Sequence, residues 1–132
     1  MTPPPRQRAR TRQAAYRHGH AAEAAAALLL LAKGFRLLAR RYRTPLGEID
    51  LVAKRGRLIA FVEVKARPSH DEGLQSVGRL SERRIVDAAD LWLAKHPDAA
   101  GLDLRYDMIL VTPWRLPRHL PDAFRPGWHK AV

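Results

Sequence analysis

Two apolar runs separated by a short basic turn are the feature that most constrains the fold of this 132-residue chain. The runs cover residues 49–53 and 58–64, and the four residues between them include Gly56. Apolar, β-branched runs joined by a glycine-containing turn are typical of a β-hairpin. We therefore expect two antiparallel strands here, with a turn centred on Arg55 and Gly56.

Strand periodicity places acidic and basic side chains on one patch of this hairpin. Side chains alternate between the two faces of a strand, so Phe61, Glu63 and Lys65 share one face. With the expected turn, Asp50 lies opposite residue 61 or 63, and its carboxylate is then roughly 4.5 to 8 Å from that of Glu63. Aspartate is a poor strand former. Its place inside an apolar run therefore predicts a local role.

Paired carboxylates of this kind are suited to binding a cation. Like charges at this distance repel and raise each other's pKa, and a metal ion between them relieves the repulsion. Asp50 and Glu63, with the main-chain carbonyl of Val64, could supply part of an octahedral magnesium shell that leaves room for water and a phosphate. Lys65 could orient an attacking water and offset charge on a phosphodiester. The alternative is a solvated sheet face with a weak Glu63–Lys65 ion pair.

The two segments of the hairpin resemble a known protein family. They read GEIDL (47–51) and FVEVKAR (61–67), and further matching segments read GHAAE (19–23), LWLA (91–94), RYD (105–107) and DAF (122–124). Over roughly residues 16–125 the chain is similar to the YraN family of small bacterial proteins, which is placed in the restriction-endonuclease-like superfamily. The aspartate followed by Glu-x-Lys is the signature of metal-dependent nucleases of the PD-(D/E)xK type. Archaeal Holliday-junction resolvases share this layout.

This resemblance implies a role for each residue of the motif. Asp50 and Glu63 would be metal ligands, Lys65 the catalytic lysine, and Glu23 an auxiliary ligand that reaches in from a preceding helix. The metal would be magnesium or manganese. The implied reaction is hydrolysis of phosphodiester bonds in DNA, in particular branched or otherwise structured DNA. An enzyme that cuts both strands of a junction would act as a symmetric homodimer.

The composition favours a polyanionic partner. The chain has 24 lysines and arginines against 13 acidic residues, a formal charge of +11, which favours nucleic acid over a membrane or an acidic protein. Where the family has a lysine near the second helix, this chain has Ser81, and Arg83 or Arg84 could replace it. We expect DNA contacts from five arginines: Arg41, Arg43, Arg67, Arg83 and Arg84.

The absence of cysteine and of a long apolar segment indicates the cellular compartment. No cysteine is present, which excludes disulfides and thiolate metal sites and is typical of the reducing cytoplasm. The apolar run 24–32 is far shorter than the roughly 20 residues that span a bilayer. We therefore expect a cytoplasmic protein with no membrane segment.

The length predicts one domain with one core. We expect a helix at 13–33, a strand at 35–43, the hairpin, a helix from an N-cap at Ser81 to about His96, and a strand at 104–112. This order corresponds to an α/β fold, a restriction-endonuclease-like α-β-β-β-α-β sandwich with a mixed central sheet. Residues 1–12, rich in proline and arginine, are expected to form a disordered basic arm, residues 13–125 the domain, and residues 126–132 a tail.

Several residues have two interpretations from sequence alone. Glu23 lies near the edge of the apolar stripe expected on the first helix (Ala24, Ala27, Leu28 and Leu31), where a glutamate is either solvated or a ligand. Asp107 could extend the acidic patch or form a structural pair with a buried arginine. The aromatic residues among the C-terminal arginines either stack on bases or fix the tail to the core: Trp114, Phe124 and Trp128. We expect the second role for Phe124.

Three functions are compatible with these features. The first is a metal-dependent nuclease, and the second is a nucleic-acid-binding protein that keeps a nuclease-like fold without catalysis. The third is a scaffold whose basic surface binds an acidic protein. Nucleic-acid binding should weaken steeply with salt, whereas only the enzyme should also require a divalent metal and Lys65.

Overall fold

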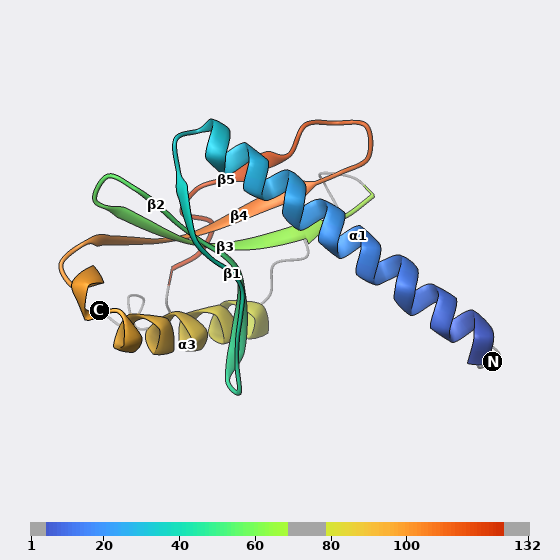
Figure 1. Cartoon of the computed structure of the whole chain (residues 1–132), viewed down its shortest axis with the longest axis horizontal. Coiled ribbons are helices and arrows are strands. Elements are labelled where there is room, and N and C mark those ends of the chain that lie inside the picture. Colours follow the sequence, from blue (N-terminus) through green and yellow to red (C-terminus); the bar gives the residue numbers. More distant parts are fainter. Residues whose placement is uncertain (1–4, 69–78, 126–132) are drawn as a thin grey trace.

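The computed structural model describes residues 5–68 and 79–125, with side chains described at 19–68 and 82–125. The predictions for residues 1–4, for the tail at 126–132 and for Trp128 lie outside this part of the chain. The described elements follow in this order (Figure 1): α1 (Pro5–Ala32), β1 (Arg36–Thr44), β2 (Gly47–Arg55), β3 (Leu58–Ala66), α3 (Arg79–Lys95), the 3-10 helix η1 (Pro97–Ala99), β4 (Asp103–Val111) and β5 (Arg118–Leu120).

The five strands form one mixed sheet. Their spatial order is β1-β2-β3-β4-β5. Strands β3 and β4 are parallel, and the other neighbouring pairs are antiparallel. The expected α/β fold with a mixed sheet is confirmed, and the short strand β5 is added to the expected order. Among the described residues, no helix is long and apolar enough to cross a membrane.

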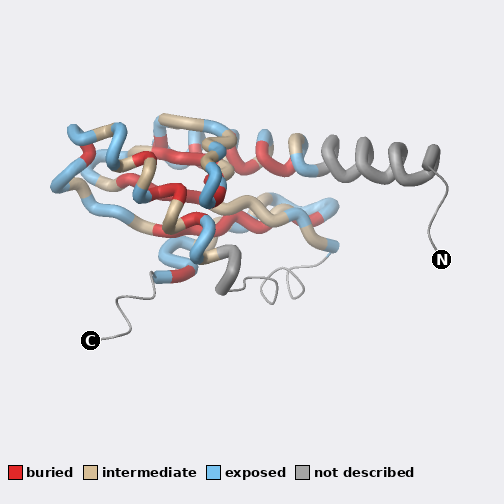
Figure 2. Tube along the Cα trace, turned by 90° about the horizontal axis from the view of Figure 1, so that it is seen from below, coloured by how far each residue is buried: buried red, intermediate tan, exposed pale blue. Residues whose placement is uncertain are grey.

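One helix covers each face of the sheet, so the core has two halves (Figure 2). On the α3 face, Trp92 packs with Phe61 and Tyr106, and the rings of Phe61 and Trp92 meet edge to face at 5.8 Å. On the α1 face, Leu30 packs with Val62. Neighbouring residues of β3 therefore point to opposite faces, as the strand periodicity predicts.

Helix α1 differs from the prediction in its start and in its buried face. It begins at Pro5, so residues 5–12 are helical, in agreement with the preference for proline in the first helical turn. Leu28 and Leu31, expected in the stripe, are 67% and 51% exposed, whereas Ala26 and Leu30 are fully buried. Because every residue of 24–32 is alanine or leucine, the sequence defines no single stripe.

Two local boundaries also differ from the prediction. The last pair of the β2–β3 hairpin is Arg55 with Leu58, so the turn consists of Gly56 and Arg57, one residue later than expected. Gly56 has a φ of 60°, the left-handed conformation that two-residue hairpin turns require. Ser81 lies within the first turn of α3, not at its N-cap.

Strands β2 and β3 separate at one end of the hairpin. Their last pair at this end is Leu51 with Val62. Beyond it, β2 stays paired with β1 as far as Gly47, and β3 stays paired with β4 as far as Ala66. Figure 1 shows the β1–β2 hairpin (teal) passing α3 while β3 (green) runs in another direction. The two arms form a fork in the sheet, and residues 50 and 63 are the first beyond the branch point.

Gly47 allows α3 to approach this fork. A Cβ atom at Gly47 would lie 2.1 Å from the carbonyl oxygen of Arg84, a distance that no real contact permits. The backbone of α3 therefore lies directly on β2 at this point. A glycine is required here for close packing.

We expect Gly47→Ala to lower the free energy of unfolding by about 2–3 kcal/mol, because α3 or β2 must shift to relieve the overlap. Gly19→Ala is a matched control, because nothing lies within 4 Å of a Cβ there. In helix α1 it should be neutral or stabilising by up to about 1 kcal/mol. Urea denaturation measures both. Equal stability of wild type and Gly47→Ala would contradict the observed packing.

A buried carboxylate fixes β5 and the following turn. Asp107 is fully buried. It accepts two hydrogen bonds from Arg105 at 2.7 and 2.8 Å and one from the backbone N–H of Asp122 at 3.0 Å, and Nε2 of His119 lies 2.8 Å away. The structural interpretation of Asp107 is therefore confirmed, although its arginine is only partly buried. Phe124 is buried against the Tyr106 ring, as expected.

Candidate functional site

The fork between β2 and β3 brings together the three residues that the sequence motif singles out. A hollow of about 260 Å³ lies between the fork and α3. Asp50, Glu63 and Lys65 all line it, together with Glu48, Val64, Arg84 and Ile85. Extending the register by one residue from the Leu51–Val62 pair places Asp50 opposite Glu63. The expected convergence of these residues is therefore observed, while their chemical roles stay predictions.

Asp50 ends the β2–β3 ladder with its side chain. Its Oδ2 accepts a hydrogen bond of 2.7 Å from the backbone N–H of Val64, which explains an aspartate within an apolar strand. Burial raises the pKa of Asp50 to about 6, against the opposing effect of the Val64 hydrogen bond. Repulsion from Glu63, Glu48 and Glu23 raises this pKa further. The charged form of Asp50 is therefore disfavoured at this site.

Glu63 and Lys65 form a mostly buried ion pair. Lys65 Nζ lies 2.7 Å from Glu63 Oε1, and the side chains are 17% and 12% exposed. The alternative prediction of a solvated surface ion pair is therefore wrong, because both side chains are mostly buried. The second oxygen, Glu63 Oε2, is buried and has no hydrogen-bond partner among the described residues. A buried carboxylate oxygen without a partner is destabilising, so a ligand that binds this atom would remove that cost.

The donor set is compatible with magnesium. Within the described ranges, no three His, Cys, Asp or Glu side chains converge as a preformed metal cage. Magnesium does not need one, because it is commonly held by one or two carboxylates, with waters and substrate phosphates completing the shell. Asp50 and Glu63 fit this requirement. The amide of Val64 binds Asp50, and its carbonyl as a further ligand stays a prediction.

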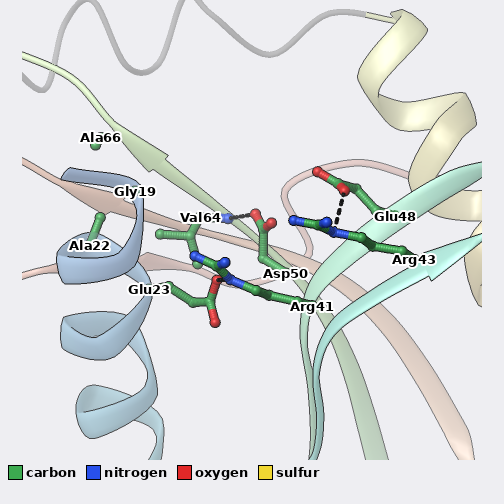
Figure 3. Close-up of a pocket in the computed structure, with 9 residues that line it drawn as sticks. All are labelled: Gly19, Ala22, Glu23, Arg41, Arg43, Glu48, Asp50, Val64 and Ala66. Atoms are coloured by element: carbon green, nitrogen blue, oxygen red, sulfur yellow. Dashed lines mark hydrogen bonds and ion pairs between the residues drawn. The ribbon is translucent and has the colours of Figure 1, made fainter. Parts of the chain in front are cut away.

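Glu23 lies in a second hollow, on the α1 side of Asp50 (Figure 3). It is 6% exposed, so it is not the solvated residue that its expected position suggested. Its Oε2 lies 2.7 Å from Nε of Arg41, and Arg40 lies 3.5 Å from its other oxygen. Arg41, predicted to bind DNA, is therefore held by Glu23. A metal bound by Glu23 would share its oxygens with these two arginines.

Of the other arginines predicted to contact DNA, two line a hollow and two do not. Arg43 lines the α1-side hollow, where it lies 3.6 Å from Glu48, and Arg84 lines the α3-side hollow beside Lys65. Arg67 follows directly after β3 and donates to the carbonyl of Ala66. Arg83 is exposed on α3 and lines neither hollow.

Glu48 is a site residue that the sequence interpretation missed. It lines both hollows and contributes to the raised pKa of Asp50. The available signal was its spacing, since residues two apart on a strand point to the same face. Glu48 is two residues before Asp50 on β2.

Comparison with known proteins identifies the family. The model of the uncharacterised protein family UPF0102 matches residues 22–111, which include the whole fork. The chain belongs to this family. A UPF0102 protein of Rhodopseudomonas palustris (strain BisB18) is 54% identical over 123 residues, covering 93% of this chain and 91% of the relative. UPF0102 is the family of the YraN proteins, so the resemblance seen in the sequence is confirmed.

Other UPF0102 relatives are similar in sequence to this chain over most of their length. A protein of Bradyrhizobium sp. (strain ORS 278) is 58% identical over 113 residues, with 86% of this chain and 80% of the relative covered. One of Rhizobium meliloti (strain 1021) is 56% identical over 110 residues, with coverage of 83% and 90%. These relatives are similar to the chain across the described domain. Their names describe no activity.

In this UPF0102 protein we expect Asp50→Asn to stabilise the metal-free fold by up to about 3 kcal/mol at pH 7–8. The pKa of Asp50 in the fold, about 6, lies above the usual 3.8, so the fold disfavours the charged form. This destabilisation is complete above about pH 6 and disappears as the pH falls to 4. Thermal melts across pH 4–8 should show a wild-type stability gain on acidification that the variant lacks.

Glu48→Gln is the matched control for this charge change. The Glu48 side chain is 51% exposed, so its replacement should change stability by less than about 0.5 kcal/mol. Magnesium should raise the melting temperature of the wild type and not that of Asp50→Asn, since a ligand stabilises only the form that binds it. An equal rise in the melting temperatures of the wild type and Asp50→Asn would show that Asp50 does not bind the metal.

Proposed function

We propose that this chain is a magnesium-dependent phosphodiesterase that acts on DNA. One observation carries the proposal. Asp50, Glu63 and Lys65 line the same hollow, and Glu63 Oε2 is buried there without a hydrogen-bond partner among the described residues. Two acidic groups and an amine around one small hollow are suited to hydrolysis of a phosphodiester bond.

The residues of the hollow divide the work. Asp50 and Glu63 would hold a magnesium ion through their carboxylate oxygens. Such an ion would supply Lewis acidity at the scissile phosphate. Lys65, fixed by Glu63, donates a hydrogen bond to the attacking water or to a phosphate oxygen on which charge develops. The Asp50–Val64 hydrogen bond keeps the first carboxylate in place when the phosphate arrives.

The charge distribution supports DNA as the substrate. The net charge of +11 favours a polyanion. Arg43 and Arg84 line the two hollows, and Arg67 lies at the end of β3, so cationic groups surround the acidic pair. We propose branched or otherwise structured DNA as the substrate, cut by a homodimer when two strands must be cleaved across a two-fold axis.

The decisive experiment incubates the purified protein with end-labelled linear, flapped and four-way branched DNA. Reactions contain magnesium, manganese or excess EDTA. We expect strand cleavage of at least one branched substrate with either metal and none with EDTA. Absence of cleavage across this panel, with binding retained, would reject the enzyme and leave a binding protein.

The alternative function is a nucleic-acid-binding protein without catalysis. Two ion pairs favour it, because Lys65 neutralises Glu63 and Arg41 neutralises Glu23, which leaves these two carboxylates compensated without a metal. Such a protein should bind DNA equally well with magnesium or with EDTA at constant ionic strength. Its affinity should fall with a log–log salt slope of about −0.9 for each duplex phosphate neutralised. Metal-dependent cleavage would exclude this alternative.

A further inference from the structure

Trp114 is a fully exposed aromatic residue in the loop between β4 and β5. Tryptophan is highly buried on average in folded proteins, and its indole is among the largest apolar surfaces that a chain can bury. Leu116, two residues later, is 87% exposed. This loop therefore presents apolar surface that the described part of the protein does not cover.

The backbone of Trp114 is held in an unfavourable conformation. Its φ is 63°, in the left-handed region that bulky side chains rarely adopt. Burial of the indole does not compensate for this strain, because the side chain is fully exposed. Strained residues of this kind concentrate at sites of binding and catalysis. Exposure and strain are two separate observations that indicate a role outside the fold.

The sheet places this loop beside the candidate site. Parallel pairing aligns Lys65 with Leu110, and the backbone N–H of Arg67 donates to the carbonyl of Val111 at 3.1 Å. The loop thus leaves β4 at the edge where β3 ends, as Figure 1 shows for the orange-red loop and the yellow-green end of β3. Trp114 is four positions beyond Leu110 in the chain, which bounds the Cα distance from Lys65 to Trp114 at about 19 Å.

This distance corresponds to a few nucleotides. A DNA strand advances about 3.4 Å per nucleotide in a duplex, so Trp114 lies within roughly six nucleotides of a phosphodiester held beside Lys65. Arg115 and Arg118 in the same segment are exposed cations that can contact phosphates on either side of a base. An exposed aromatic residue followed by exposed arginines is suited to binding single-stranded nucleic acid by stacking.

We propose that Trp114 stacks on an unpaired base within about six nucleotides of the scissile phosphodiester, so that the preferred substrate has a single-stranded segment near the cut. This inference rests on the proposed function and assigns its substrate class. The bases inside a duplex are stacked on each other and present no free face to an indole. A flap, fork or single strand presents such a face.

Binding measured without divalent metal tests this inference independently of catalysis. Fluorescence anisotropy in EDTA at fixed salt compares a single-stranded oligonucleotide, a flap and a blunt duplex of equal length. Trp114→Ala should weaken binding to the first two by 5- to 150-fold, the range that corresponds to loss of one base–aromatic stack. Binding to the blunt duplex should change by less than about twofold. Equal weakening on all three probes, or none, would overturn the inference.

Two further variants separate stacking from general effects of the loop. Trp114→Phe keeps an aromatic ring and should retain most of the single-strand affinity. Leu116→Ala removes another exposed apolar side chain of the same loop and should leave all affinities unchanged. Because Trp114 is exposed, the melting temperature of the alanine variant should match the wild type. Selective loss of single-strand binding without any cleavage would reject the nuclease and keep the stacking. If Trp114→Ala changes neither cleavage nor binding, the stacking is rejected and the nuclease is kept.

Discussion

Replacing Lys65 with methionine is expected to reduce the rate of magnesium-dependent DNA cleavage by roughly 10²- to 10³-fold. Methionine keeps most of the length of the side chain but removes the ammonium group, which is the only hydrogen-bond donor of the Lys65 side chain. The loss should appear in kcat with little change in KM, because the amine acts on charge that develops during the reaction. Single-turnover cleavage of the best substrate from the panel measures it.

Lys54→Met is the matched control for net charge. Lys54 pairs with Ile59 on the same hairpin, away from the hollow that Lys65 lines. Both variants lower the charge of the protein by one, so both should weaken non-specific DNA binding equally. Only Lys65→Met should lose cleavage. A similar loss in both variants would show that the lysine attracts DNA without taking part in the chemistry.

Asp107→Asn is expected to lower the free energy of unfolding by about 3–5 kcal/mol, because breaking a buried ion pair leaves an uncompensated partner. The carboxylate accepts from Arg105 and from the backbone of Asp122, with His119 also in contact. An amide replaces one acceptor oxygen with a donor, which cannot meet these groups. Urea denaturation measures the loss. Asp122→Asn removes an exposed ion pair with Arg125 and should change stability by less than about 1 kcal/mol.

The same residue predicts the acid sensitivity of the fold. Burial alone would raise the pKa of Asp107, but the hydrogen bonds from His119, Arg105 and the Asp122 backbone outweigh it and lower the pKa to about 2. A lowered pKa stabilises the fold fully above about pH 4, and this stabilisation is lost as the pH falls to 2. Stability curves between pH 5 and 2 should therefore fall less steeply for Asp107→Asn. Parallel curves would contradict the lowered pKa.

Much of the fold follows from short-range patterns in the chain. The two runs around Gly56 predict the hairpin, because strand periodicity and turn chemistry act between neighbouring residues. The buried face of α1 could not be predicted, since the run 24–32 is apolar on every side. Strand β5 was also missed, because its three residues gain their stability from the pairing with β4 and from Asp107.

The candidate site shows the same division. The sequence by itself determined that Asp50, Glu63 and Lys65 lie at the same end of one hairpin, because the hairpin register brings residues 50 and 63 to the same level just beyond the Leu51–Val62 pair. Only the tertiary structure decided the rest: the fork after Leu51, the backbone contact of Gly47 with α3, the pairing of Glu23 with Arg41, and the position of Trp114 beside the end of β3. Each depends on contacts between segments far apart in the chain. Such contacts depend on how the helices pack on the sheet, which no local pattern encodes.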